Sequence, residues 1–266
     1  MGNIISVQHI IKKYKEVIAV NDVSFDVQEG EIFGFLGPNG AGKSTTIKML
    51  TTLLLPTSGQ LSLAGIDVIK EQAKARKVFG IVFQDPSLDG DLTAYENLEL
   101  HAVLYNLDKK KALQRMEELL KLVELWDRRG SLVKTFSGGM KRRLEIARGL
   151  LHHPKILFLD EPTLGLDAQT RNLLWNYIAR LNKEEGMTIF FTTHYLAEAE
   201  AVAHRIAIID HGKIVAFGTA EELKRQTGQD NLEKAYLELT GTAVRDESLS
   251  SADNKKEMIR RIITNR

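Results

Sequence analysis

The first third of the chain alternates hydrophobic and polar positions, and turn residues separate the hydrophobic stretches. Residues 23–27 (Val-Ser-Phe-Asp-Val) have the two-residue period of a half-buried strand. A helix is predicted from Lys43 to about Leu55, where Pro56 ends it. The strands predicted in this part are Ile4–Ile10, Val23–Val27, Glu31–Leu36, Gly59–Gly65 and Val78–Phe83.

Between Pro86 and Pro154 the hydrophobic positions follow the period of helices. Thr93 and Glu96 have the spacing of a capping box, which opens the first of these helices. The predicted helices run over about 93–107, 109–125 and 139–151. Because this block is helical where its surroundings are mixed, we expect a helical subdomain inserted into an α/β core.

After Pro154, apolar strands alternate with helical segments. This alternation predicts a parallel sheet with crossover helices. Residues 210–213 (Asp-His-Gly-Lys) predict a tight hairpin turn into one more strand. The predicted strands are Lys155–Leu159, Thr188–Thr192, Arg205–Ile209 and Ile214–Phe217, and the predicted helices are Asp167–Lys183, Tyr195–Ala203, one capped by Thr219, and Asn231–Leu239.

The composition narrows the class of protein. The 266 residues are 43% hydrophobic, enough to fill a core, and the net charge of +1 creates no field toward nucleic acid or anionic membrane. The absence of cysteine excludes disulfides and thiolate metal sites. The apolar runs are far shorter than the roughly 20 residues of a membrane-spanning helix, and the N-terminus lacks the pattern of a secretory signal. We therefore expect a soluble intracellular protein.

The strongest chemical signal lies between the predicted strand Glu31–Leu36 and the helix that begins at Lys43. It matches G-x-x-x-x-G-K-[ST] at every fixed position. Backbone N–H groups of such a loop surround phosphate oxygens, and the helix N-terminus adds positive potential. We expect Lys43 to reach the β- and γ-phosphates and Ser44 to bind Mg²⁺, whereas the alternative is a structural glycine-rich turn. The predicted nucleotide-binding residues are Gly37, Pro38, Asn39, Gly40, Ala41, Gly42, Lys43, Ser44 and Thr45.

Two carboxylates follow the apolar strand that ends at Leu159. Asp160 and Glu161 are expected where α/β sheets bind ligands, at the carboxyl end of a buried parallel strand. Because successive strand residues face opposite ways, one carboxylate is expected on the metal and the other on the attacking water. A solvated strand end is the alternative, and the phosphate-binding loop favours the functional interpretation.

A second candidate phosphate cradle precedes the basic helix predicted at 139–151. Ser137, Gly138 and Gly139 stand at its N-terminus, where backbone N–H groups and positive potential attract anions. An ordinary serine N-cap is the commoner use of such a sequence. The motif lies 23 residues before Asp160, which leaves room for one helix and a short turn.

These motifs, with Gln84 after one predicted strand and His194 after another, follow in the order of the ATP-binding cassette (ABC) ATPases, which this sequence resembles from about Ile4 to Gly241. The resemblance implies an α/β P-loop NTPase (RecA-like) core with an antiparallel β subdomain and an inserted α-helical subdomain. It implies one nucleotide-binding domain over 1–240, with the β subdomain at 1–30 and 59–83, the core at 31–58 and 155–225, the helical subdomain at 86–154, and a C-terminal tail at 241–266.

The resemblance also implies cofactors and roles. ATP and Mg²⁺ are the implied cofactors. Tyr14 resembles the aromatic that stacks on adenine, although a packing aromatic at a strand end is the alternative. Ser137, Gly139 and Asp167 are implied to act across a dimer interface. The implied catalytic residues are Lys43, Gln84, Glu161 and His194, and the implied metal ligands are Ser44, Gln84 and Asp160. Met140 departs from the widespread signature, which has Gln there, and we expect activity to survive.

A finer resemblance is carried by residues 85–89 (DPSLD), 92–98 (LTAYENL) and 232–241 (LEKAYLELTG). They look most like the daunorubicin-resistance, ABC-2-type exporter ATPases. This implies a head-to-tail homodimer or heterodimer, a separate transmembrane permease, and a place on the cytoplasmic face of the cell membrane. The implied cargo is a drug, lipid or polysaccharide, and no nucleic acid is expected.

Other protein classes share parts of the pattern. A GTPase or small-molecule kinase is disfavoured because residues 182–185 (NKEE) lack the aspartate that reads guanine. A soluble ABC ATPase acting on ribosomes or nucleic acid is the serious alternative. Only 53 residues separate Gln84 from Ser137, which leaves no room for a long coiled-coil insertion, and the chain has one cassette. The basic tail has a short apolar stripe from Met258 to Ile263, which predicts either a docked helix or a lipid contact.

Overall fold

The computed structural model describes residues 2–241, so all but the first residue of the predicted C-terminal tail lies outside the described residues. The strands are β1 (Asn3–Tyr14), β2 (Val17–Gln28), β3 (Ile32–Leu36), β4 (Ser58–Leu63), β5 (Ile66–Asp67), β6 (Phe79–Val82), β7 (Ile156–Asp160), β8 (Thr188–Thr193), β9 (Arg205–Asp210) and β10 (Lys213–Gly218). The helices are α1 (Lys43–Leu50), α2 (Gln72–Ala75), α3 (Ala94–Leu104), α4 (Lys109–Leu122), α5 (Gly138–Leu150), α6 (Ala168–Glu185), α7 (Leu196–Val202), α8 (Ala220–Thr227) and α9 (Leu232–Thr240), with short 3-10 turns at Trp126–Arg128 and Val133–Thr135.

The larger sheet has six strands in the order β10-β9-β3-β8-β7-β6. Its strands run parallel except for β10, which returns antiparallel to β9 through the hairpin turn that residues 210–213 predict. The parallel sheet with crossover helices that the alternating pattern predicts is therefore confirmed. The carboxyl ends of β3, β7 and β8 meet at one edge, where α/β folds place their ligands.

One boundary of the predicted subdomains is wrong. The predicted antiparallel subdomain extends to Phe83, but β6 pairs parallel with β7 in the larger sheet. The reason is its contact with α5: a Cβ added to Gly80 would lie 2.2 Å from the carbonyl oxygen of Gly149. A strand that packs this closely under a helix belongs to the helix-covered sheet.

The smaller sheet has the order β2-β1-β4-β5, and all its neighbours are antiparallel. Strands β1 and β2 have 12 residues each, longer than the hydrophobic stretches that predicted them. Many of the added residues are exposed, and backbone pairing, as in Lys13 with Ile18, continues the strands beyond the predicted ends. Hydrophobic period alone therefore underestimates these strands.

Helix α1 ends at Leu50 and not near Leu55 as predicted. Thr52 has a positive φ of 62°, and the N–H of Leu53 returns to the carbonyl of Lys48 at 2.9 Å. The chain thus turns out of the helix before Pro56 can act, and its backbone donors are satisfied by the last turn.

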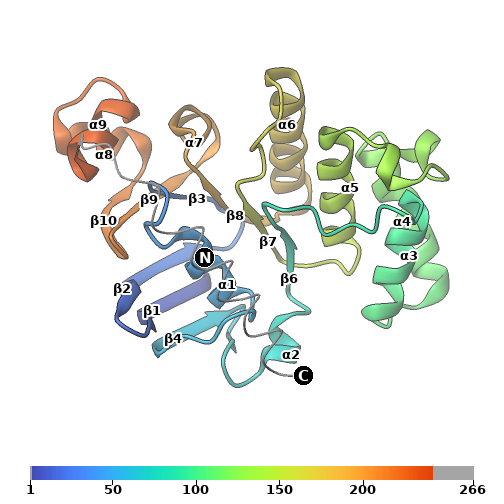
Figure 1. The fold of residues 1–266 in the computed structure, drawn as a ribbon, viewed down its shortest axis with the longest axis horizontal. Helices are drawn as coiled ribbons and strands as arrows, with labels where there is room; N and C mark the ends of the chain where they lie inside the picture. Colours follow the sequence, from blue (N-terminus) through green and yellow to red (C-terminus); the bar gives the residue numbers. More distant parts are fainter. Residues whose placement is uncertain (1, 242–266) are drawn as a thin grey trace.

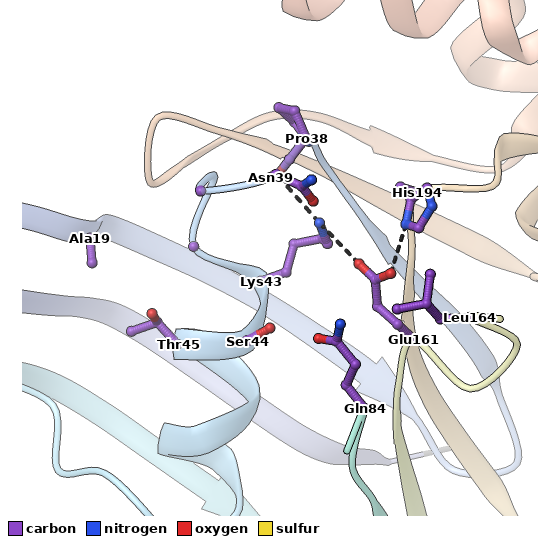
Figure 2. A pocket seen from close by; sticks show the side chains of 12 residues that line it. Ala19, Pro38, Asn39, Lys43, Ser44, Thr45, Gln84, Glu161, Leu164 and His194 are labelled. Carbon is purple, nitrogen blue, oxygen red and sulfur yellow. Dashed lines mark hydrogen bonds and ion pairs between the residues drawn. The ribbon is translucent and has the colours of Figure 1, made fainter. Parts of the chain in front are cut away.

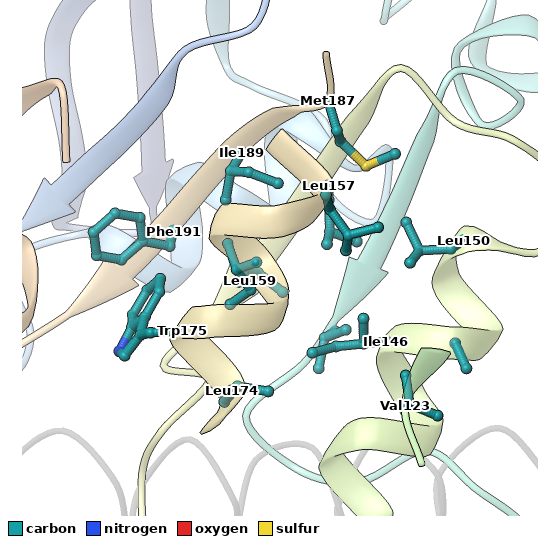
Figure 3. Packing of buried hydrophobic residues seen from close by; sticks show 14 of the residues in the cluster. Val123, Ile146, Leu150, Leu157, Leu159, Leu174, Trp175, Met187, Ile189 and Phe191 are labelled. Carbon is teal, nitrogen blue, oxygen red and sulfur yellow. The ribbon is translucent and has the colours of Figure 1, made fainter. Parts of the chain in front are cut away.

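Alternate residues of the central strands point to opposite faces of the large sheet and belong to two hydrophobic cores. Phe33, Phe158 and Phe190 lie with α1 and the smaller sheet, whereas their strand neighbours belong to the opposite cluster. In that second cluster, residues of β7 and β8 pack against α5 and α6 (Figure 3), and the labelled contacts are Leu157, Leu159, Ile189, Phe191, Ile146, Leu150, Leu174 and Trp175. The large sheet is therefore covered on both faces.

Helices α3, α4 and α5 form a group at one end of the molecule, and α8 and α9 lie at the other (Figure 1). Thr93 caps α3 with a capping box, as its spacing with Glu96 predicts. Within residues 2–241 no helix combines the length and the apolar character needed to cross a bilayer.

Candidate active site

The phosphate-binding loop joins β3 to α1. Gly42, the N-cap of α1, has a φ of 111°, and a Cβ there would lie 2.6 Å from the carbonyl oxygen of Ala19. Only glycine fits both the conformation and the space. No acidic side chain stands in the first turn of α1. The helix N-terminus therefore presents N–H groups and positive potential to an anion.

An open pocket of about 380 Å³ lies above this loop (Figure 2). This volume falls within the range of small-molecule sites. The residues that line it are Ala19, Pro38, Asn39, Gly40, Gly42, Lys43, Ser44, Thr45, Gln84, Glu161, Leu164 and His194. The structure thus gathers into one place most of the predicted loop together with Gln84, Glu161 and His194, which come from three other segments of the chain.

Lys43 lies at the centre of this pocket, and its side chain is almost fully buried. Its Nζ donates to the carbonyl oxygen of Gly37 at 2.8 Å and to that of Pro38 at 3.3 Å, and it lies 3.5 Å from Oε1 of Glu161. Burial lowers the pKa of Lys43, and the neighbouring carboxylates of Glu161 and Asp160 oppose that shift. The ammonium is therefore desolvated and ready to be paired with an anionic ligand.

Glu161 departs from the strand geometry of β7. Its φ is 48°, and its N–H donates to both the carbonyl and the hydroxyl oxygen of Thr192, at 3.2 and 3.0 Å. This turn directs the carboxylate into the pocket, where Oε2 lies 2.7 Å from Nδ1 of His194. One carboxylate therefore contacts both a buried cation and an imidazole.

Asp160 takes a different environment from its neighbour. Its Oδ1 accepts a hydrogen bond from the Thr192 hydroxyl at 2.7 Å and from Ser44 Oγ at 3.4 Å. Burial raises the pKa of Asp160, with a smaller contribution in the same direction from Glu161. Two oxygen donors, Ser44 and Asp160, thus meet beside the phosphate-binding loop, and oxygen donors of this kind suit Mg²⁺.

Some predicted residues do not line the pocket. Ala41 is buried in the core beneath the loop, and Gly37 contributes its carbonyl oxygen to Lys43. Tyr14 ends β1 and is 45% exposed, and its side chain makes a hydrogen bond with Thr45. Tyr14 therefore borders the loop from outside the pocket.

The second candidate cradle lies elsewhere, together with Asp167. Ser137 caps α5, and its Oγ accepts from the N–H of Met140 at 3.2 Å. Asp167 caps α6 and accepts from the N–H of Thr170 at 2.9 Å. A Cβ on Gly139 would lie 2.4 Å from Cγ2 of Thr170. The starts of α5 and α6 are thus in contact with each other, and among the described residues neither belongs to the lining of the pocket.

Sequence reasoning missed Thr192, which joins the two carboxylates. Thr192 pairs with Asp160 across β7 and β8, and its hydroxyl is fully buried. The signal was present as a polar residue ending the apolar strand next to the one that carries Asp160, because the carboxyl ends of neighbouring parallel strands lie side by side. Leu164 and Ala19 were also missed, and apolar lining residues carry no such signal.

Comparison with known proteins agrees with this geometry. The profile of the family described as "ABC transporter" matches residues 20–164. The linearmycin resistance ATP-binding protein LnrL of Bacillus subtilis is 44% identical over 225 residues, which are 85% of this chain and 72% of that protein. The daunorubicin resistance ATP-binding protein DrrA3 of Streptomyces coeruleorubidus is 40% identical over 234 residues, 88% of this chain and 74% of that protein.

Solved structures show the same fold. One described as the ATP binding subunit of an ABC transporter superposes with a TM-score of 0.81 at 33% identity, covering 89% of this chain and 99% of that one. A dimeric post-hydrolysis state of the ATP-binding cassette MJ0796, bound to ADP and Pi, superposes with a TM-score of 0.73 at 30% identity, covering 81% and 98%. The chain therefore belongs to the ABC transporter family, as an ATP-binding and ATP-hydrolysing member of it.

Proposed function

We propose that this chain is the ATPase subunit of an ABC-2-type exporter and that two such subunits enclose two ATP molecules. One observation carries the proposal. Glu161 contacts both Lys43 and His194 beside the phosphate-binding loop, so a base, a cation and an imidazole converge on one pocket. A cation that binds the phosphates and a base that activates water are two of the parts that phosphoryl transfer to water uses.

Lys43 and the loop hold the triphosphate in this proposal. Lys43 exchanges the carbonyl oxygens of Gly37 and Pro38 for phosphate oxygens, because a buried ammonium gains more from a charged partner than from a dipole. Ser44, Asp160 and Gln84 are the residues that would hold Mg²⁺. The ion would supply charge neutralisation between the phosphates.

Glu161 serves as the general base. It takes a proton from the attacking water, and its buried position keeps it close to the γ-phosphate. His194, hydrogen-bonded to Glu161, orients the γ-phosphate and holds the carboxylate in place. Tyr14 stacks on adenine from the edge of the loop.

Ser137, Gly139 and Asp167 act on the nucleotide of the other subunit. Support comes from their position: they share one surface at the starts of α5 and α6, apart from the pocket that holds Lys43. Two chains arranged head to tail complete each other's sites, and the MJ0796 cassette is dimeric in its ADP-bound and Pi-bound state. A symmetric two-chain assembly satisfies both sites at once.

The exporter assignment rests on the relatives. LnrL and DrrA3 are named for resistance to linearmycin and daunorubicin, which are drugs. We infer that this chain drives a separate permease from the cytoplasmic face of the membrane and that the cargo is a drug, lipid or polysaccharide. The two ATPase subunits are either identical or two related chains.

The first test of this mechanism is Glu161→Gln. The amide keeps the shape of the side chain but cannot accept the proton, so kcat for ATP hydrolysis should fall by about 10²- to 10⁴-fold while ATP binding is retained. Phosphate release and nucleotide binding are measured on the same preparation. Glu99→Gln, on an exposed position of α3, is the control and should leave both unchanged. Turnover near that of the unsubstituted chain would remove Glu161 as the base.

The transport role is tested separately. A tagged Glu161→Gln chain, with ATP, is used to capture partners from detergent-solubilised membranes of the source cell. A stoichiometric protein with several membrane-spanning helices is the expected partner. Recovery of ribosomes, nucleic acid or soluble proteins alone would leave the ATPase in place and overturn the exporter assignment.

A further inference from the structure

Helix α5 carries a row of charged side chains that face the segment after β6. Arg142, Glu145 and Arg148 are three residues apart along the helix, so they lie on one face of it. Glu145 is 0% exposed and Arg142 is 5% exposed. Charged side chains are seldom buried to this degree unless they are paired.

All three side chains bind the backbone on either side of Gln84. Arg142 donates through Nη1 to the carbonyl oxygen of Phe83 and through Nη2 to that of Gln84, at 3.0 Å for the latter. Glu145 accepts from the N–H of Ser87 at 2.8 Å, and Arg148 donates to the carbonyl oxygen of Ser87 at 2.7 Å. The Gln84–Ser87 backbone is therefore held at both ends by one helix.

An ion pair links two of the charged side chains on α5, Arg142 and Glu145. Nη1 of Arg142 lies 3.2 Å from Oε2 of Glu145 inside the protein. Loss of either partner leaves a buried charge uncompensated, which is costly. The arginine can satisfy two carbonyl oxygens and a carboxylate at once because its guanidinium is a planar fork of donors.

The same helix begins at the second phosphate cradle. Ser137 caps α5 five residues before Arg142, a rise of about 7.5 Å along a helix. A helix of 13 residues moves as a rigid element, so a displacement at Ser137 is passed to Arg142. At the other end of this chain of contacts, Gln84 lines the pocket of Lys43.

We propose that Arg142 and Glu145 are positioning residues that set Gln84 according to the place of α5, so that occupation of the cradle at Ser137 adjusts the pocket of Lys43 in the same chain. This inference rests on the proposed function, since it needs a nucleotide at both ends. In addition to holding α5 to β6, Arg142 and Glu145 would then couple the cradle at Ser137 to the pocket of Lys43.

The test is a double-mutant cycle on ATP hydrolysis with Gln84→Ala and Glu145→Gln. Glu145→Gln should lower kcat between about twofold and thirtyfold, the range for residues that carry coupling between sites, with KM for ATP unchanged because Lys43 is untouched. If Glu145 acts through Gln84, the double variant should be no slower than Gln84→Ala alone. Multiplied effects of the two substitutions would overturn the proposal.

Arg143→Gln is the matched control. Arg143 is the next residue on α5, but it donates to the carbonyl oxygen of Val123 and lies 3.5 Å from Glu124, so it faces α4. Its loss removes a charged side chain from the same helix without touching the Gln84–Ser87 backbone, and should leave kcat close to that of the unsubstituted chain. An equal loss of kcat in Arg143→Gln would show a general effect of the helix and overturn the proposal.

A second variant covers failure of Glu145→Gln to fold, judged by circular dichroism. Arg142→Lys keeps the buried charge but cannot bind two carbonyl oxygens and a carboxylate together, and it is placed in the same cycle with the same expectation. If the proposed function itself is wrong, the experiment gives a different result. In that case Gln84→Ala alone has unchanged kcat, which removes the role of Gln84 and the positioning role together.

Discussion

Asp160 and Glu161 are adjacent carboxylates with opposite surroundings. Asp160 continues β7 and is held by hydroxyl groups of Thr192 and Ser44. Glu161 turns out of the strand and meets Lys43 and His194. The sequence predicts different surroundings because successive strand residues face opposite ways, whereas in the structure the difference arises because Glu161 leaves the strand. Thr192, which contacts both residues, lies on another strand and was found only in the folded chain.

Asp160→Asn should stabilise the protein and abolish hydrolysis. Burial raises the native pKa of Asp160 above its ordinary value of 3.8, so the fold favours the uncharged form that asparagine mimics. The stability of the unsubstituted chain relative to the variant should be lost as pH rises from 3.8 through the raised native pKa, and then stay constant. At pH 7 we therefore expect the variant to melt at a higher temperature than the unsubstituted chain.

Thermal melts across this pH range check the prediction. Asp91→Asn, at an exposed position, is the control and should not raise the melting temperature at pH 7. A variant that is less stable at pH 7 than at pH 4 relative to the unsubstituted chain would contradict the sign of the effect.

The starts of α5 and α6 pack closely against each other at the second candidate cradle. The side chain of the residue before each helix caps its N-terminus, Ser137 for α5 and Asp167 for α6. Gly139 sits against Thr170 with no room for a Cβ, whereas Gly138 has only Leu166 at 4.0 Å. The caps confirm the ordinary structural role that each residue has within this chain, and they leave the helix N-termini facing outward from it.

Gly139→Ala should lower stability, and Thr170→Ser should restore it. The added Cβ meets Cγ2 of Thr170 at 2.4 Å, and serine lacks that methyl group while keeping the hydroxyl that binds Asp167. A clash of this kind costs about 1–3 kcal/mol. Denaturant melts of the single and double variants measure it, with Gly138→Ala as the uncrowded control. Failure of Thr170→Ser to recover stability would show that the clash is not the cause.

The accuracy of the sequence predictions differs from element to element. Strands β7 and β8 were predicted within a residue or two because both faces of each are buried and the signal is a continuous apolar run. Strand β6 has the same kind of signal, but its partner lies over 70 residues away, so its sheet was assigned wrongly. The phosphate-binding loop was predictable because all its chemistry is local. The row on α5 was not, since its partners lie about 60 residues earlier.

The chain has two helix ends that we propose to bind phosphate, and only the start of α1 opens into the pocket above the phosphate-binding loop. The start of α1 opens into the pocket of Lys43, and the start of α5 does not belong to it. A single chain therefore holds half of each proposed site. In a head-to-tail pair, the pocket of each chain would meet the cradle of the other, and both proposed sites would be complete.

Mixing two inactive chains should restore activity. Lys43→Ala removes the phosphate-binding lysine, and Ser137→Arg blocks the cradle, so neither variant should hydrolyse ATP alone. In mixed dimers one site combines the intact Lys43 of one chain with the intact Ser137 of the other. An equal mixture should reach about a quarter of the normal rate, because about half of the dimers are mixed and each has one good site. No recovery would contradict the shared site.

The left-handed backbone of Glu161 has a consequence for engineering. A glutamate at a φ of 48° is held in a conformation that costs about 1–3 kcal/mol, and glycine or asparagine would adopt it more readily. Replacements that relieve this strain remove the side chain that we propose as the general base. Directed evolution that selects only for heat resistance would therefore favour substitutions at position 161. The selected chains would have higher melting temperatures and reduced ATP hydrolysis. Any such campaign on this protein needs catalysis as a second selection from its first round.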